Sequence, residues 1–161
     1  AYTLLPFGNT AFLLKMTGAE FKAAIQEGVT TAASGVSSGA WPYITGGRFY
    51  CDMNQAMGSQ VTKVEVKNAD GSYSAIDEAA TYKIVTNNYI ADGGDSYTTL
   101  EAATAYRYDT GLVDAETFTD YVKKNTPLTT MDTGIVYTPA AAGDEMISAD
   151  KEFMGEYGEA G

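Results

Sequence analysis

The sequence predicts an α+β domain with a mixed sheet, built partly from hairpins, and with two main helices. Three observations predict this fold class: a strand that runs directly into a capped helix, two β-rich segments that flank a turn, and an amphipathic helix far along the chain. The chain has 161 residues, of which 45% are hydrophobic and 19% charged. This is enough apolar material for a core at this size.

The first strand and helix have the clearest local signals. Residues 10–16 read Thr-Ala-Phe-Leu-Leu-Lys-Met, which is typical of a buried strand. A capping box follows, in which the Thr17 hydroxyl accepts from a backbone N–H and Glu20 reaches back to the start of the helix. The helix should continue to Val29 with an apolar face. Residues 30–39 are rich in Ser, Thr, Ala and Gly, so we expect a loop there.

The middle of the chain predicts strands. Residues 48–51 follow two glycines, and residues 61–66 and 73–76 flank an Asn-Ala-Asp-Gly turn, which indicates a hairpin. Residues 82–86 predict a further strand, with a loop over residues 87–95.

A second helix should run from about residue 115 to residue 125, with Asp114 as its N-cap. Its apolar stripe would consist of Phe118, Tyr121 and Val122.

Charge and composition exclude several classes of function. The net charge is −11, so nucleic-acid polymers and anionic membranes are poor partners. The chain has no histidine and a single cysteine, Cys51, which excludes a Ser-His-Asp triad, a Cys-His dyad, a histidine-metal site and an intrachain disulfide within it. We interpret Cys51 as a small buried apolar residue. We expect neither a catalytic residue nor a metal ligand in this chain.

The organisation of the chain suggests one domain over residues 1–138 and an acidic tail or linker over residues 139–161. No apolar stretch approaches the roughly 20 residues that a membrane span needs. The chain starts at Ala1 without an initiator Met, so we expect a processed or trimmed polypeptide.

Three clusters are candidates for a binding site, and each has a structural alternative. Phe7 is held between Pro and Gly just before the first strand, but it could be a core residue of a turn, and Asn9 could cap a strand end. In the segment 87–97 an aromatic residue precedes Gly-Gly-Asp, although the aspartate and glycines could simply form a turn. Gly46-Gly47 could present backbone amides to a ligand or form a bulge or tight turn at the start of a strand.

Four motifs stand in order along residues 4–125. They are Leu5-Pro6-Phe7-Gly8 with the strand and the Thr17-Gly18 helix start behind it, Gly46-Gly47-Arg48, Asn87-Asn88-Tyr89-Ile90-Ala91-Asp92-Gly93-Gly94-Asp95-Ser96-Tyr97, and Asp109-Thr110-Gly111-Leu112-Val113-Asp114. In order and spacing they resemble the C-terminal, substrate-binding domain of the 5'-nucleotidase and UDP-sugar hydrolase family. Ser96 departs from the Gly that the family usually has at that position.

The resemblance implies a nucleoside site. Phe7 and Tyr89 would stack on the two faces of the base, and Asp95 would bind the ribose hydroxyls. Asn9 is the next candidate for a polar contact with the nucleoside, and Gly46 or Gly47 would approach the base edge. Arg48 and Arg107 are the remaining arginines, and neither is assigned to phosphate.

The resemblance also implies that the chemistry lies elsewhere. Family members carry two divalent metal ions in an N-terminal metallophosphoesterase domain. That domain would be the partner of this chain. The family's C-terminal domain usually begins with a further helix and strand, and this chain lacks them. We therefore expect this chain to be the substrate-recognition part of a secreted enzyme. The enzyme would be extracellular, periplasmic or at the cell surface. We expect no phosphatase activity from this chain alone. The alternatives are a non-catalytic nucleoside-binding or cell-surface interaction module with the same fold, and a purely structural domain.

Overall fold

The computed structural model describes residues 2–128 and 134–141, and the chain divides into two compact units. The first unit comprises Ala1–Ala24 and Ile76–Asp132, and the second comprises Ile25–Ala75 and Thr133–Gly161. Each unit has a sheet of its own.

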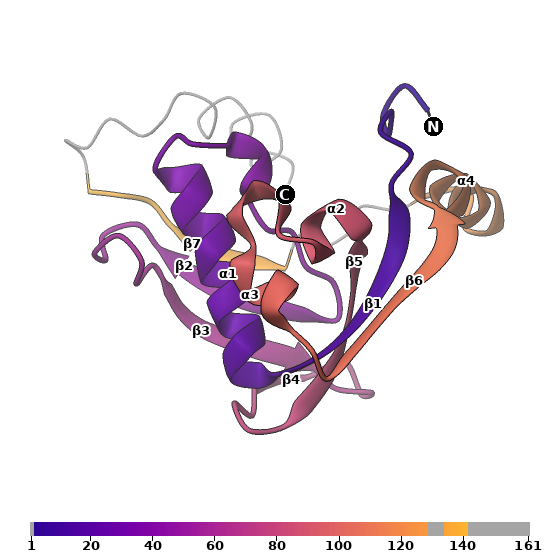
Figure 1. Ribbon diagram of the computed structural model, residues 1–161. Coiled ribbons are helices and arrows are strands. Elements are labelled where there is room, and N and C mark those ends of the chain that lie inside the picture. Colours follow the sequence, from indigo (N-terminus) through magenta and orange to yellow (C-terminus); the bar gives the residue numbers. More distant parts are fainter. Residues whose placement is uncertain (1, 129–133, 142–161) are drawn as a thin grey trace. The chain divides into compact units, whose positions relative to one another are not determined.

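The sheet of the first unit is antiparallel, with β1 (Thr10–Thr17) between β5 (Thr81–Asn87) and β6 (Tyr106–Val113) (Figure 1). Side chains along β1 alternate between the two faces of the sheet. Phe12, Leu14 and Met16 are buried, whereas the intervening residues are partly exposed. The predicted strands 10–16 and 82–86 are confirmed.

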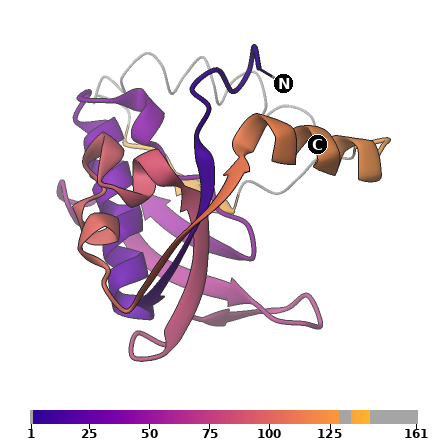
Figure 2. The same ribbon diagram turned by 45° about the vertical axis from the view of Figure 1, so that its right-hand side comes forward.

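Short helical segments connect β5 to β6. They are α2 (Asn88–Ala91), the 3-10 turn η2 (Gly94–Ser96) and α3 (Thr98–Ala102). The predicted loop over residues 87–95 is therefore wrong in part, because the Asn87 side chain caps a helical turn by accepting a hydrogen bond from the Ile90 N–H at 2.8 Å. Helix α4 (Asp114–Lys124) continues directly from the end of β6 (Figure 2).

The predicted second helix is confirmed as α4, with two corrections. Val113 is the N-cap and Asp114 is the first helical residue, whose carboxylate accepts from the N–H of Ala115 at 2.6 Å. The predicted apolar stripe does not form a core, since Phe118 is 40% exposed and Tyr121 46%. In α4 only Ala115 is buried.

Helix α1 (Gly18–Ala33) begins in the first unit and ends in the second. The predicted capping box is confirmed: the Glu20 N–H donates to the Thr17 hydroxyl at 3.2 Å, and the Thr17 N–H donates to the Glu20 carboxylate at 2.7 Å. The predicted loop over 30–39 is wrong at its start, because residues 30–33 are helical. Thr31 and Ala32 are buried in this last part of the helix, and such packing stabilises helices more than propensity does.

The second unit holds a four-stranded sheet in the order β4–β3–β2–β7. Its strands are β2 (Gly47–Asp52), β3 (Val61–Lys67), β4 (Tyr73–Ala75) and β7 (Ile135–Thr138). The β3–β4 hairpin is confirmed, and its turn is closed by a bond of 2.8 Å from the Asn68 N–H to the Ser72 carbonyl. Strands β2 and β7 are parallel, so the sheet is mixed.

The core of the second unit includes Phe49 and Cys51 of β2 and Val64 of β3. The Cys51 side chain is buried, as interpreted from the sequence, and its thiol donates to the Met53 sulfur at 3.6 Å. A 3-10 turn, η1 (Ser38–Ala40), precedes β2.

The predicted fold class, α+β with a mixed sheet, hairpins and two main helices, is confirmed. Strands β6 and β7 and helix α3 were not predicted. The boundary at residue 138 stays a prediction, because most of the predicted tail lies outside the described residues. No helix in the described part of the chain is long and apolar enough to cross a membrane.

Candidate functional site

The candidate site lies in the first unit, where the segment before β1 meets the start of α2. The N–H of Thr10 donates to the Asn88 side-chain oxygen at 2.9 Å, and this bond joins residues that are 78 positions apart. The adjacent Asn87 caps α2, so the two asparagines of the motif have different structural tasks. Together they fix the position of Tyr89, which follows them in the first turn of α2.

Gly94 determines how the Tyr89 ring lies. A Cβ atom placed on Gly94 would be 2.5 Å from Cε1 of Tyr89 and 2.6 Å from both Cδ1 and Cζ. Nearly equal distances to three consecutive ring atoms put the Gly94 backbone over one face of the ring. Tyr89 is nevertheless 51% exposed, so much of its ring surface remains open to solvent.

Asp95 lies beside this ring. Its Oδ1 is 3.5 Å from the Tyr89 phenolic oxygen, a long hydrogen bond. The backbone of Asp95 has φ 53° and that of Ser96 φ 68°, both in the left-handed region that residues with a Cβ rarely adopt. Non-glycine residues in this conformation concentrate at functional sites, because the surrounding structure must hold them there.

Phe7 and Asn9 lie in the segment that leads into β1. Phe7 is 85% exposed, which excludes the alternative of a core residue. The Asn9 carbonyl accepts from the N–H of Asp114 at 2.8 Å and thereby ties this segment to the start of α4. Since Phe7 is three residues from Thr10, its Cα lies at most about 11 Å from that of Thr10, which is bonded to Asn88.

Gly46 and Gly47 belong to the second unit and have local tasks there. Gly46 has φ 75° and its carbonyl accepts from the Lys67 N–H at 3.0 Å. A Cβ on Gly47 would lie 2.7 Å from the Glu65 carbonyl oxygen on β3. The structural alternative, a tight turn at the start of a strand, therefore accounts for both glycines, and their contact with a ligand stays a prediction.

The charged groups around the loop are mostly carboxylates. Asp92 and Asp95 lie within it, and the Glu101 carboxylate faces Gly93, where a Cβ would lie 2.8 Å from Oε2. The cation Arg107 is bound to Asp92 at 2.7 Å. Carboxylates accept hydrogen bonds from hydroxyl groups, so this arrangement suits a neutral diol better than a phosphate.

In the part of the chain that the structure describes, no group of three or more His, Cys, Asp or Glu residues is placed so that it could hold a metal ion.

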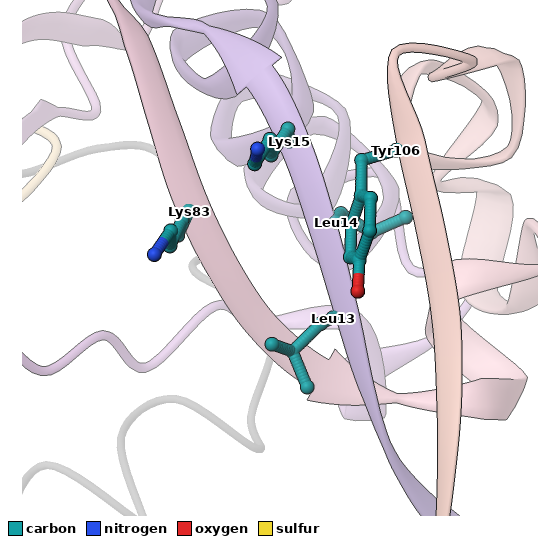
Figure 3. A pocket seen from close by; sticks show the side chains of 5 residues that line it. All are labelled: Leu13, Leu14, Lys15, Lys83 and Tyr106. Carbon is teal, nitrogen blue, oxygen red and sulfur yellow. The ribbon is translucent and has the colours of Figure 1, made fainter.

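A separate shallow pocket lies on the outer face of the same sheet (Figure 3). It has a volume of about 190 Å³ and is lined by Leu13, Leu14, Lys15, Lys83 and Tyr106. The ammonium group of Lys15 is 5.2 Å from the centre of the Tyr106 ring. Lys15 and Lys83 are directly opposite one another on β1 and β5, so two like charges meet at this pocket.

The profile of the family described as "5'-nucleotidase, C-terminal domain" matches residues 1–102 of the chain. The chain belongs to this family. A probable 5'-nucleotidase of Treponema pallidum (strain Nichols) is 40% identical over 126 residues, which is 76% of this chain and 21% of the relative. The NAD 5'-nucleotidase of Haemophilus influenzae is 37% identical over 131 residues, or 78% of this chain and 22% of that protein.

Solved structures agree with this assignment to the 5'-nucleotidase C-terminal domain family. The 5'-nucleotidase precursor of Thermus thermophilus superposes with a TM-score of 0.80 at 38% identity, covering 87% of this chain and 27% of that one. The Haemophilus influenzae NAD nucleotidase gives a TM-score of 0.79 at 32% identity, covering 87% and 26%. The chain thus spans about a fifth of the length of the two curated relatives, 21% and 22%.

In this 5'-nucleotidase C-terminal domain, sequence reasoning gave no role to Arg107, which also contacts the candidate site. Arg107 donates hydrogen bonds to the loop that carries Asp95, but most of its acceptors are backbone carbonyls. Every residue type has a carbonyl, so no pattern in the sequence marks these partners.

Proposed function

We propose that this chain is the nucleoside-recognition part of a metal-dependent 5'-nucleotidase-type phosphohydrolase. Phe7 and Tyr89 stack on the two faces of the base, and Asp95 accepts hydrogen bonds from the ribose hydroxyls. The observation that carries the proposal is the pairing of an exposed aromatic ring with a carboxylate, Tyr89 with Asp95 at 3.5 Å, on a loop in a left-handed conformation.

The exposure of the two aromatic rings supports the stacking. Phe7 and Tyr89 are 85% and 51% exposed, although aromatic side chains stabilise a fold mainly when they are buried. Stacking on a base covers such rings and contributes ~1–3 kcal/mol per base. It tolerates different bases, so it supplies affinity more than selectivity. Asn9 would add a polar contact with the nucleoside.

The hydrolytic step belongs to other parts of the protein. We propose that two divalent metal ions in an N-terminal metallophosphoesterase domain activate water and stabilise the charge of the displacement, while these residues hold the leaving nucleoside. We also propose a location outside the cytoplasm, on the family resemblance. Metal-dependent phosphatase activity of the 161-residue chain by itself would contradict this division of labour.

Calorimetric titration of the full-length polypeptide that contains this chain, with adenosine and AMP, tests the proposal. Phe7→Ala and Tyr89→Ala should each weaken binding roughly 5- to 150-fold, the equivalent of one lost stacking contact. Tyr108→Ala is the matched control, because Tyr108 is a 54% exposed tyrosine that pairs with Leu13 on the outer face of the sheet. Absence of binding by the wild type would overturn the function, and unchanged affinity in both variants would overturn the stacking.

A further inference from the structure

Arg107 joins the two ends of the loop that carries the candidate site. One terminal nitrogen, NH2, donates to the Ala91 carbonyl at 2.8 Å and to the Asp92 carboxylate at 2.7 Å. The other, NH1, donates to the Leu100 carbonyl at 2.7 Å, with longer contacts to the carbonyls of Glu101 and Ala103. A single guanidinium group therefore binds the loop before its glycines and again at α3, its last helical segment.

The segment between these two ends needs such a restraint. Gly93, Asp95 and Ser96 all have positive φ, at 87°, 53° and 68°. For a residue with a Cβ, the left-handed conformation costs roughly 1–2 kcal/mol. Two consecutive residues of this kind, in a partly exposed stretch, need contacts on both sides that hold the backbone in this conformation.

The chemistry of arginine suits this position. Its planar group presents N–H donors in fixed directions, so it can bind carbonyls on both sides of the loop at once. A lysine ammonium reaches fewer acceptors and imposes no plane. The guanidinium carbon is 5.1 Å from the centre of the Phe12 ring on β1, a buried residue, and this contact holds the group against the sheet.

We propose that Arg107 is a positioning residue of the nucleoside site: it holds the loop 91–103 in the conformation in which Asp95 lies beside Tyr89, and it does not contact the ligand. The inference rests on the proposed function. Both terminal nitrogens of Arg107 already donate to the protein, so we do not assign Arg107 to phosphate binding.

Arg107→Lys in the full-length polypeptide tests this role with two measurements. Hydrogen exchange followed by mass spectrometry should show faster exchange in peptides from residues 92–102, with exchange in β1 and α4 unchanged. Calorimetry should show adenosine binding weakened by about tenfold, a smaller loss for 2'-deoxyadenosine, and no loss of cooperative unfolding. If Arg107 had only a structural role, the variant would be less stable to heat, and the ratio of its affinities for adenosine and 2'-deoxyadenosine would not change.

Arg48→Lys is the matched control. Arg48 also binds a carboxylate, that of Glu65 at 2.6 Å, and lies 4.1 Å from the centre of the Tyr73 ring, but it belongs to the second unit. This variant should lose stability and keep the affinity for adenosine. If Arg107→Lys fails to fold, Asp92→Ala removes one anchor at a 65% exposed side chain and should give the same changes to a smaller extent.

The outcomes separate this inference from the proposed function. A wild type that binds neither adenosine nor AMP overturns the proposed function and the positioning role together. A wild type that binds, with unchanged affinity in the Arg107 and Asp92 variants, overturns the positioning role and leaves the function standing. Unchanged exchange in the loop overturns it as well, whatever the affinity.

Discussion

The backbone of Gly94 lies against one face of the Tyr89 ring, so close that a methyl group on Gly94 would come within 2.5 Å of a ring carbon. A single glycine thus determines the orientation of the aromatic ring that we assign to base stacking. The contact is between a backbone and a partly exposed side chain, so either group could be changed without disturbing a buried core.

Gly94→Ala should weaken adenosine binding with little loss of stability. The new methyl group displaces the Tyr89 ring, which is 51% exposed and can turn into solvent. We expect an effect comparable to that of Tyr89→Ala, roughly 5- to 150-fold in affinity. In a Tyr89→Ala background the same substitution should cost nothing further, and an additive loss in this double-mutant cycle would show that the ring is not the cause.

Asp95→Asn should reduce the affinity for adenosine and narrow its preference over 2'-deoxyadenosine. Asparagine tolerates the left-handed backbone, so the loop conformation is kept while the charge that strengthens the hydrogen bonds to the hydroxyls is removed. The loss should be about 10- to 150-fold, the range for a hydrogen bond to a charged group. Asp70→Asn, in a turn of the second unit, is the control, and an equal loss there would argue against a specific role for Asp95.

Gly18→Ala should destabilise the protein by about 1–3 kcal/mol, as overpacking of a buried site does. A Cβ at this buried position would lie 2.3 Å from the Asp77 carbonyl oxygen and 2.9 Å from its carbon. Both atoms are backbone, so they cannot swing aside as a side chain would. Denaturant unfolding measures the change, with Ala19→Ser at the exposed neighbouring position as the control; equal midpoints for the two variants would contradict the packing argument.

Glu65 should contribute to the loss of stability in acid. Hydrogen bonds from Lys63, Arg48 and Tyr50 lower its pKa to about 2, well below the usual value of a glutamate. A carboxyl group whose pKa is lower in the folded state stabilises the protein above its unfolded pKa of about 4.3, and this contribution is lost as the pH falls toward 2.

Glu65→Gln tests this directly through the thermal midpoint measured over the same pH range. The variant should be less stable at neutral pH, because Arg48 and Lys63 lose their charged partner. Between pH values of about 4.3 and 2 its curve should be flatter than that of the wild type. Parallel curves for the two proteins would mean that other carboxylates account for the acid sensitivity.

Lys83→Glu should raise the thermal midpoint. The substitution turns the opposed lysine pair Lys15–Lys83 into a pair of opposite charge, and such cross-strand pairs contribute roughly 0.2–1 kcal/mol. The gain should shrink as salt is added. Lys124→Glu makes the same change in net charge at the last residue of α4, where a cation is favourable, and should lower stability instead. A gain in both variants would indicate a general effect of charge.

Much of the fold could be predicted because its signals are local. The capping box of Thr17 and Glu20 needs residues only three positions apart, and the alternation along β1 follows from the geometry of an extended chain. The family was recognisable for a related reason, since its motifs are short and stand in a fixed order. These patterns identified Tyr89 and Asp95 as candidates without any knowledge of their contacts.

The tertiary structure alone decided how these residues are held. Arg107 donates hydrogen bonds to backbone carbonyls, and the Gly94 backbone lies against the face of the Tyr89 ring. The hydrogen bond from Thr10 to Asn88 joins residues 78 positions apart. Thr31 and Ala32 are buried where α1 continues beyond the expected end of the helix, and the parallel pairing of β2 with β7 joins distant segments. The physical reason is the same in each case: local geometry is encoded by neighbouring residue types, whereas a carbonyl, a ring face or a buried surface finds its partner only once the chain has folded.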